Sequence, residues 1–365
     1  MDDNLKLYQE LTEAPGAPGQ EDEVRAIMRR YLEPFGRIVQ DNLGSIYAEK
    51  IGQAGGVGSA PDHAPRIAVA GHMDEIALMV TRITDEGFIK FTGLGGWFDY
   101  VMPAQRMTVH TRKGVITGVV GNKPPHTMSE QERKKPADKK NMYLDIGAAS
   151  RQEAEEGGVR PGDPILPICP FTTMLNPKLM MAKAWDNRAG CAAAVLVLRE
   201  LARGSHPNVV YAGGTVQEEV GTRGAQTSAA LVQPDIAFVL DVGMAGDIPG
   251  AEGGEVTASL GKGPIITLYD PSHVPHRALR EFVCEVADAE GIPYQFDVLA
   301  HGGTDAARFH LWNKGAPSLY IGFPARYVHS AASVVHRDDL ENAARLVAAV
   351  IRRLDADALK RIRGF

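Results

Sequence analysis

Cysteine is scarce in this chain of 365 residues, which contains only Cys169, Cys191 and Cys284. Their number is odd, and no two of them form a Cys-x-x-Cys pair. We therefore expect neither a disulfide framework nor a thiolate zinc site. Free thiols fit a reducing compartment, so a cytoplasmic protein is expected.

The sequence also lacks the features of proteins that bind nucleic acids or membranes. The net charge is −6, and no basic cluster is interleaved with aromatic residues, so no nucleic-acid partner is expected. No run approaches the ~20 apolar residues that a spanning helix requires. The acidic start, Met1-Asp2-Asp3-Asn4, lacks the pattern of a signal peptide, and no membrane partner is expected.

What is present is the composition of a globular protein, with 44% hydrophobic and 23% charged residues. Strand-like apolar runs alternate with helical patterns in residues 1–77 and again in 178–365. This alternation predicts an α/β fold whose mostly parallel sheet is covered by helices on both faces. Residues 78–177 instead carry short β-type runs between glycine-rich turns, which predicts a small inserted all-β domain, barrel-like in form.

Two segments are predicted to be surface loops. The stretch from Gly52 to Pro65 is rich in glycine, alanine and proline and has no periodicity. The stretch from Gly121 to Asn141 is polar and holds a short basic run, for which a solvated loop is the simplest interpretation. The sequence assigns neither loop a role.

Two adjacent carboxylates, Glu218 and Glu219, follow an apolar run that predicts a buried strand. An isolated acidic pair is usually a solvated turn, because acids are mostly exposed. In α/β proteins, however, the carboxyl ends of the strands are where ligands bind. Gly221 and Gly224 permit the chain to leave the strand here, so that both carboxylates can face one cavity.

Four further segments each place a metal-type ligand where an apolar run ends or a helix begins. They supply His72 with Asp74, then Asp186, Asp241 and His329. Taken singly, each histidine has a structural interpretation, Asp186 is explained as a helix N-cap, and Asp241 as a turn residue. Their joint occurrence with Glu219 predicts a nitrogen and oxygen site suited to zinc, cobalt or manganese.

Two spacings assign further roles. His72 and Asp74 are two residues apart and would point the same way in a strand, so Asp74 can orient the imidazole. Glu218 then remains free beside the ligand Glu219. A free carboxylate next to a metal-activated water is what a general base requires.

Six motifs resemble those of the dinuclear-metal aminopeptidases of the tetrahedral (TET) type, which include glutamyl and leucyl aminopeptidases and some proteins labelled endoglucanase. They are Gly71-His72-Met73-Asp74-Glu75-Ile76, Lys183-Ala184-Trp185-Asp186-Asn187-Arg188, Gln217-Glu218-Glu219-Val220-Gly221, Leu240-Asp241-Val242-Gly243, Gly302-Gly303-Thr304-Asp305-Ala306 and Arg326-Tyr327-Val328-His329-Ser330. The order of the motifs and the position of the insert also match, and the resemblance covers nearly the whole chain.

The resemblance implies two divalent metal ions per subunit, with zinc or cobalt favoured. His72, Asp186 and Asp241 would hold one ion. Asp186, as a bridge, would hold the other together with Glu219 and His329. Glu218 would be the catalytic base, and Asp74 would tune His72. Relatives of this kind use the inserted domain to build a homo-oligomer in which dimers assemble to a dodecamer.

The function predicted on this basis is removal of N-terminal residues from short peptides through a two-metal-activated water. A related dinuclear hydrolase acting on N-acyl amino acids or C-terminal residues is the alternative. Its extra domain usually follows the fourth ligand, whereas here the insert lies between His72 and Asp186. A glycosidase is disfavoured, since its two carboxyls stand ~5–9.5 Å apart across the bond. A non-enzymatic scaffold is disfavoured by the intact ligand set.

Three further expectations concern the surroundings of the site. His301 is a candidate for the substrate pocket, and Thr304 with Asp305 would cap the following helix. Arg326 and the loop Gly243–Gly250 are candidates for the pocket wall, because they adjoin ligands. The preferred N-terminal residue, the native metal and the choice between dimer and dodecamer are not determined by the sequence.

Overall fold

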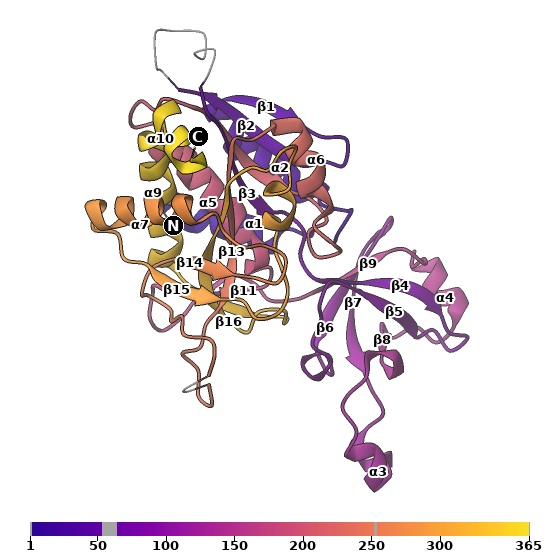
Figure 1. Cartoon of the computed structure of the whole chain (residues 1–365). Coiled ribbons are helices and arrows are strands. Elements are labelled where there is room, and N and C mark those ends of the chain that lie inside the picture. The colour runs from indigo at the N-terminus through magenta and orange to yellow at the C-terminus, as the bar shows by residue number, and fades with distance from the viewer. Residues whose placement is uncertain (1, 53–63, 252–253, 365) are drawn as a thin grey trace.

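The computed structural model describes residues 2–52, 64–251 and 254–364. The predicted surface loop from Gly52 to Pro65 therefore lies mainly outside the described residues. Figure 1 shows a layered α/β part, which holds both ends of the chain, and a smaller β part beside it.

The α/β part is built on a mixed sheet ordered β1-β2-β12-β3-β13-β16-β17-β11-β10, with β14 and β15 attached through β16. The strands are β1 (Arg37–Gln40), β2 (Ile46–Ile51), β3 (Arg66–His72), β10 (Thr172–Thr173), β11 (Leu179–Ala182), β12 (Val209–Thr215), β13 (Ile236–Met244), β14 (Ile265–Tyr269), β15 (Gln295–Val298), β16 (Ser318–Arg326) and β17 (Ser333–His336). The central strands β12, β3, β13 and β16 run parallel. The β1–β2–β12 and β16–β17–β11 pairings are antiparallel. The strands β14 and β15 also pair in parallel, whereas β10–β11 and β14–β16 are antiparallel. The sheet is thus mixed rather than mostly parallel.

Helices cover both faces of this sheet, because alternate side chains of each central strand point to opposite faces. The helices are α1 (Asp3–Glu13), α2 (Asp22–Leu32), α5 (Trp185–Leu201), α6 (Arg223–Val232), α7 (Arg277–Glu290), α8 (Ala306–Phe309), α9 (Arg337–Arg353) and α10 (Ala356–Arg363), with a 3₁₀ turn at Glu33–Phe35. In β3, Ile67 and Val69 join the large core formed with α1, α2, α5, α7 and α9. Ala68 and Ala70 join a second core formed with α6 and α8.

The smaller part is a closed antiparallel barrel ordered β4-β5-β8-β7-β6-β9. Its strands are β4 (Ala77–Ile83), β5 (Ile89–Leu94), β6 (Arg106–Thr111), β7 (Gly114–Gly121), β8 (Tyr143–Asp145) and β9 (Pro164–Pro167). They enclose their own core, which includes Leu78, Val109 and Leu144. Two short helices flank the strands, η2 (Asp99–Val101) and α4 (Arg151–Glu156). The predicted small β domain is therefore present as a six-stranded barrel.

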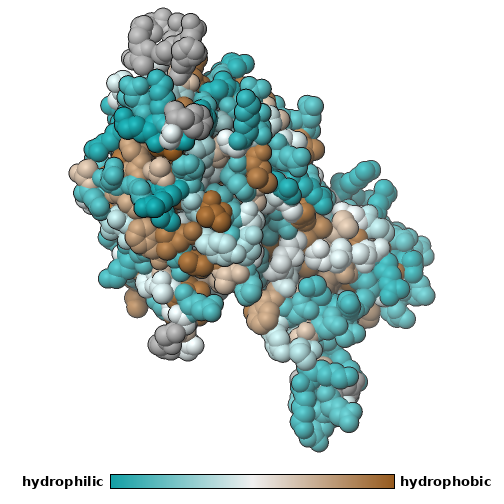
Figure 2. Space-filling model, in the orientation of Figure 1, coloured by the Kyte–Doolittle hydropathy of each residue, from teal (hydrophilic) through white to brown (hydrophobic). Residues whose placement is uncertain are grey.

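The segment predicted as a solvated loop between Gly121 and Asn141 contains three short helical turns. They are η3 (Pro125–Thr127), α3 (Glu130–Arg133) and η4 (Lys139–Asn141). This arm projects from the barrel in Figure 1 and is mostly hydrophilic in Figure 2. Solvation was predicted correctly, but the helical turns were not. Among the described helices, none is long and apolar enough to cross a membrane.

Candidate metal centre

The structure brings the predicted site residues together at one edge of the sheet. His72 is the last residue of β3, and Asp241 lies in β13. Glu218 and Glu219 occupy the turn after β12, Asp186 opens α5, and His329 follows β16. The parallel strands β12, β3, β13 and β16 present their carboxyl ends at the same edge, which is where such sheets bind ligands.

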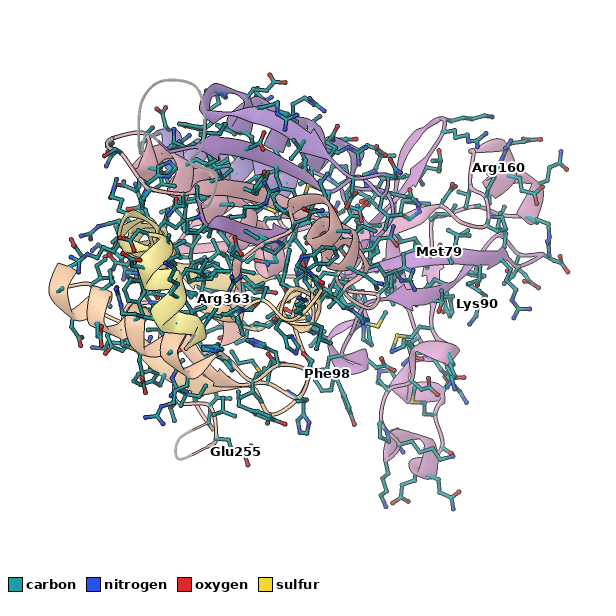
Figure 3. All side chains as sticks on the ribbon, turned by 45° about the horizontal axis from the view of Figure 1, so that its top comes forward. Met79, Lys90, Phe98, Arg160, Glu255 and Arg363 are labelled. Carbon is teal, nitrogen blue, oxygen red and sulfur yellow. The ribbon has the colours of Figure 1, made fainter. Side chains whose placement is uncertain are left out.

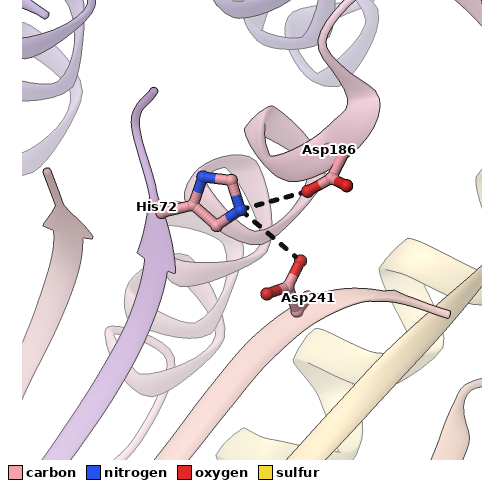
Figure 4. Close-up of side chains that lie close together, drawn as sticks. All are labelled: His72, Asp186 and Asp241. Carbon is pink, nitrogen blue, oxygen red and sulfur yellow. Dashed lines mark hydrogen bonds and ion pairs between the residues drawn. The ribbon is translucent and has the colours of Figure 1, made fainter. Parts of the chain in front are cut away.

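His72, Asp186 and Asp241, here called the His72 group, form the first cluster with metal-ligand geometry. Each offers one ligand atom, and these atoms lie within 4.8 Å of one another. His72 Nε2 lies 3.0 Å from Asp186 Oδ1 and 3.8 Å from Asp241 Oδ1 (Figure 4). The imidazole of His72 is 2% exposed, so this group is enclosed by protein.

Asp186, Glu219 and His329, here called the His329 group, form the second cluster and share Asp186 with the first. His329 Nε2 lies 3.4 Å from Asp186 Oδ2 and 3.7 Å from Glu219 Oε2. The imidazole of His329 is 41% exposed, in contrast to His72. One carboxylate therefore faces a histidine on each side.

The charges at this edge are poorly compensated by the protein alone. Burial, followed by the neighbouring Asp186, raises the pKa of Glu219 to about 8. Burial also raises the pKa of Asp241 well above its ordinary value. Glu219 Oε1 is buried and has no hydrogen-bond partner among the described residues. Crowded, buried carboxylates with an orphaned oxygen fit divalent cations, which supply the missing positive charge.

The two histidines respond to the same carboxylates. Burial alone would lower the pKa of His72, but Asp241, Asp186 and Asp74 raise it well above its usual value. The hydrogen bond to Asp186 is the main reason that the pKa of His329 rises to about 9. Burial would raise the pKa of Asp186, but its bonds to both histidines lower it. Asp186 is thus the ionised centre of the cluster.

Glu218 belongs to neither group, although it stands beside both. Its Oε2 lies 3.8 Å from His72 Nε2, and its side chain is 11% exposed. Burial raises the pKa of Glu218 well above the ordinary range, while the charge of His72 opposes this rise. A carboxyl group with a raised pKa beside a metal-ligand cluster is suited to accept and return a proton.

Two buried carboxylates hold the turn that carries Glu218 and Glu219. Asp74 accepts hydrogen bonds from the backbone N–H groups of Glu218 and Glu219, each at 3.0 Å. Glu21 accepts from the N–H of Gln217 at 3.1 Å and from that of Gly19 at 2.7 Å. Three consecutive amides are therefore fixed, which sets the direction of both glutamates. Glu21 was not identified from the sequence, because a single acid at a helix start carries no distinguishing pattern.

Asp74 also contacts His72, as its spacing suggested. The nearer partner of His72 Nδ1 is the backbone carbonyl oxygen of Asp74, at 3.0 Å, while the carboxylate Oδ1 lies at 3.4 Å. The carboxylate is mainly engaged by the two amides of the glutamate turn. Asp74 therefore connects the imidazole with that turn.

A buried ion pair ties two ligand-bearing segments together behind the site. Glu75 Oε1 accepts from Lys183 Nζ at 2.5 Å and from Arg188 Nη2 at 3.3 Å. Glu75 lies three residues after His72, and Lys183 lies three residues before Asp186. Removing one partner would leave an uncompensated buried charge, so this contact fixes the two segments relative to each other.

The cluster opens into a cavity of about 870 Å³. His301 lines it, as predicted, together with Met244, Leu299 and Val328. Arg326 does not line this cavity; its guanidinium pairs with Asp247 at 2.7 Å. Of the loop Gly243–Gly250, Met244 alone reaches the wall.

The prediction that Asp305 caps α8 is wrong for its side chain. The carboxylate makes no capping bond and is buried, where it accepts a hydrogen bond from Thr215 Oγ1 at 2.5 Å. Thr304 does bond the N–H of Ala306, at 3.3 Å. Asp305 is turned toward the end of β12 because Thr215 offers it a buried donor there.

Comparison with protein families matches residues 53–346 to the M42 glutamyl aminopeptidases. The chain belongs to this family. It is therefore a peptidase of the aminopeptidase type. Among curated relatives, the glutamyl aminopeptidase of Lactococcus lactis is 34% identical over 97% of this chain and 98% of its own length.

Solved structures of TET peptidases share the whole fold. The TET aminopeptidase of the archaeon Thaumarchaeota archaeon SCGC AB-539-E09 is 42% identical, covers 99% of this chain and 100% of its own, and superimposes with a TM-score of 0.94. The TET1 peptidase of Pyrococcus horikoshii is 32% identical over 96% of this chain and 100% of its own, with a TM-score of 0.83. That protein assembles into a tetrahedron or a large octahedral shell.

Proposed function

We propose that this M42 peptidase removes N-terminal residues from short peptides with the help of two divalent metal ions, zinc or cobalt. The observation that carries the proposal is the pair of ligand groups that share Asp186 beside an uncommitted carboxylate, Glu218. His72 and Asp241 would complete one ion site, and Glu219 and His329 the other. Ions held there would lower the pKa of water and polarise the scissile carbonyl.

Glu218 is the proposed proton carrier. It would accept the proton of the attacking water and return it to the leaving amine. Asp74 would support both proton transfer and metal binding, since it holds the backbone of Glu218 and contacts the ring of the ligand His72. The raised pKa of Glu218, caused mainly by burial, suits a group that must carry the proton between these two steps.

The division of the chain follows from the same proposal. Residues 1–77 and 178–365 would form the catalytic domain, and residues 78–177 the inserted domain that contributes to dimerisation and assembly. The tetrahedral and octahedral assemblies of the P. horikoshii relative support a homo-oligomer. That dimers of this chain build a dodecamer is part of the proposal. The free state of Cys169, Cys191 and Cys284 supports a cytoplasmic location.

The decisive variant is Glu218→Gln, which keeps the shape of the side chain and removes the base. We expect kcat to fall about 10²- to 10⁴-fold, the range of general acid–base catalysis, while the metal content stays at two ions per chain. Steady-state kinetics with aminoacyl substrates and metal analysis of the same sample test this. Full turnover by a metal-loaded Glu218→Gln chain would refute the assignment.

Two further experiments test the metal requirement and the reaction class. Chelation should abolish activity, and added zinc or cobalt should restore it, whereas chelator-resistant turnover would refute the metal requirement. A panel that contrasts free aminoacyl with N-acyl substrates tests the reaction class. Preference for the N-acyl set would indicate the related deacylase instead.

A further inference from the structure

We propose that the inserted barrel forms one wall of the metal centre: its residues Gly95 and Gly96 pack against Glu219 and His329 and hold these ligands in place. This inference rests on the proposed function, because it concerns how the chain supports its second ion. It gives the barrel a role in metal binding within each subunit, in addition to any role in assembly.

The approach of the barrel to the ligands leaves no space for a side chain. A Cβ atom on Gly96 would lie 2.8 Å from His329 Nδ1 and 3.0 Å from its Cε1. A Cβ atom on Gly95 would lie 2.8 Å from Glu219 Oε2, and the φ of Gly95 is +89°. Real Cβ contacts are not this short, so the backbone of this segment lies directly against both side chains.

The barrel backbone and the carboxylates contact different atoms of the His329 ring. His329 Nε2 faces the carboxylates of Asp186 and Glu219, and the adjoining Nδ1–Cε1 edge of the ring faces Gly96. The imidazole is therefore held between the carboxylates and the barrel backbone. Because metal ligands depend on the contacts that orient them, this position matters for affinity.

The barrel segment is firmly attached to its own domain. Leu94, just before Gly95, pairs with Ala77 at the start of β4. The indole Nε1 of the buried Trp97 donates to the carbonyl of Ala77 at 3.0 Å. In Figure 3 the next residue, Phe98, lies between the α/β part and the barrel. The segment thus has little freedom to retreat from the ligands.

His329, by contrast, is not anchored by a helix or a strand. It lies outside the helices and strands, its φ is +59°, and its side chain is 41% exposed. An added methyl group at Gly96 should therefore displace the imidazole rather than the barrel. Gly96 is exposed and has no positive φ, so alanine itself is compatible with its backbone. The expected defect is in metal binding and not in folding.

Gly96→Ala is the test, and Gly93→Ala is its matched control. Gly93 lies in the same strand region, and a Cβ atom there would meet nothing closer than 3.6 Å. Metal-stripped proteins are titrated with Co²⁺, with calorimetry for stoichiometry and visible absorption for the ligand environment. We expect wild type and Gly93→Ala to bind two ions, and Gly96→Ala to bind the second ion about 10- to 100-fold more weakly. Equal thermal midpoints of the stripped variants would exclude a folding defect.

A double-mutant cycle with His329→Gln shows whether the contact acts through this ligand. If it does, Gly96→Ala adds no further loss in the His329→Gln background. Additive losses, or wild-type affinity of Gly96→Ala for both ions, would overturn the inference while the proposed function stands. A wild-type chain that binds fewer than two ions would instead overturn the proposed function and this inference with it.

Discussion

The two ligand groups share Asp186 but are built by different means. The His72 group takes its other two ligands from the central strands β3 and β13, and the imidazole of His72 is 2% exposed. The His329 group takes them from the turn after β12 and the segment after β16, and the imidazole of His329 is 41% exposed. Strands place the first group, whereas loops and the barrel backbone place the second.

The two groups should differ in how well they tolerate the removal of a metal ligand. A ligand removed from an enclosed group leaves buried carboxylates that water cannot reach, which is costly. A ligand removed from an exposed group can be replaced by a water molecule. We therefore expect the His72 group to hold its ion more firmly and to be the less replaceable of the two.

Replacing each histidine by glutamine should give the largest difference between the two groups in metal binding and activity. His72→Gln should abolish binding of one ion and reduce kcat/KM by more than about 10³-fold, because a lost ligand removes most metal-dependent catalysis. His329→Gln should weaken the other ion, and excess zinc or cobalt should restore much of its activity. Calorimetry of metal-stripped protein and activity assays over a range of metal concentrations make the comparison.

The thermal midpoints of the metal-stripped variants serve as the control for folding. Equal rescue of both variants by excess metal would break the distinction between an enclosed and an open group. Rescue of His72→Gln alone would reverse it. Either result would show that exposure of the imidazole does not decide how well water replaces it.

The same division explains what the sequence predicts and what it does not. His72 and Asp241 end or follow apolar runs, so the strand pattern alone places them at one edge of a sheet. His329 was predicted in the same way, but it lies three residues beyond the end of β16, so its position depends on the loop that follows the strand. Glu21 and Gly96 act through contacts with residues about 200 positions away in the chain, and local sequence carries no information on such contacts. The antiparallel outer strands were also missed, since pairing direction depends on the tertiary arrangement.

Substitution of Glu21 should have a smaller effect on activity and should affect the His329 group without affecting the His72 group. Glu21→Leu removes the acceptor for the N–H of Gln217 and loosens the turn of Glu218 and Glu219. We expect kcat to fall about 10-fold, the cost of roughly one hydrogen bond, and the second ion to bind several-fold more weakly. The first ion should bind as in wild type, because the His72 group does not include this turn.

Glu21→Gln is the matched variant, since its amide oxygen can accept the same two hydrogen bonds. Burial, followed by the charge of Asp74, raises the pKa of Glu21 to about 7, so about half of the Glu21 side chains are neutral at that pH. Kinetics and metal titration of both variants should place Glu21→Gln near wild type. A large loss with glutamine, or weaker binding of the first ion with leucine, would contradict a role confined to the turn.

A third histidine, His273, separates the effect of burial from that of the carboxylates, with the smallest expected effect on activity. The imidazole of His273 is fully buried, and burial and the neighbouring His310 lower its pKa to about 4 although the carboxylate of Asp270, 3.9 Å from Nδ1, opposes this shift. The pKa of the buried His72, which faces several carboxylates, is raised. The folded state therefore keeps His273 neutral, while the unfolded chain binds a proton below pH 6.5. Stability from this difference is complete above pH 6.5 and is lost as the pH falls toward 4. At pH 5 the loss amounts to about 2 kcal/mol.

His273→Gln removes this titration, so the decrease in unfolding midpoint between pH 7.5 and pH 5 should be smaller than in wild type, with peptidase activity at pH 7.5 unchanged. Thermal unfolding at the two pH values, at fixed metal concentration, measures it. An identical decrease in the two proteins would mean that His273 is charged in the fold, and that burial does not set the protonation of histidines outside the metal centre.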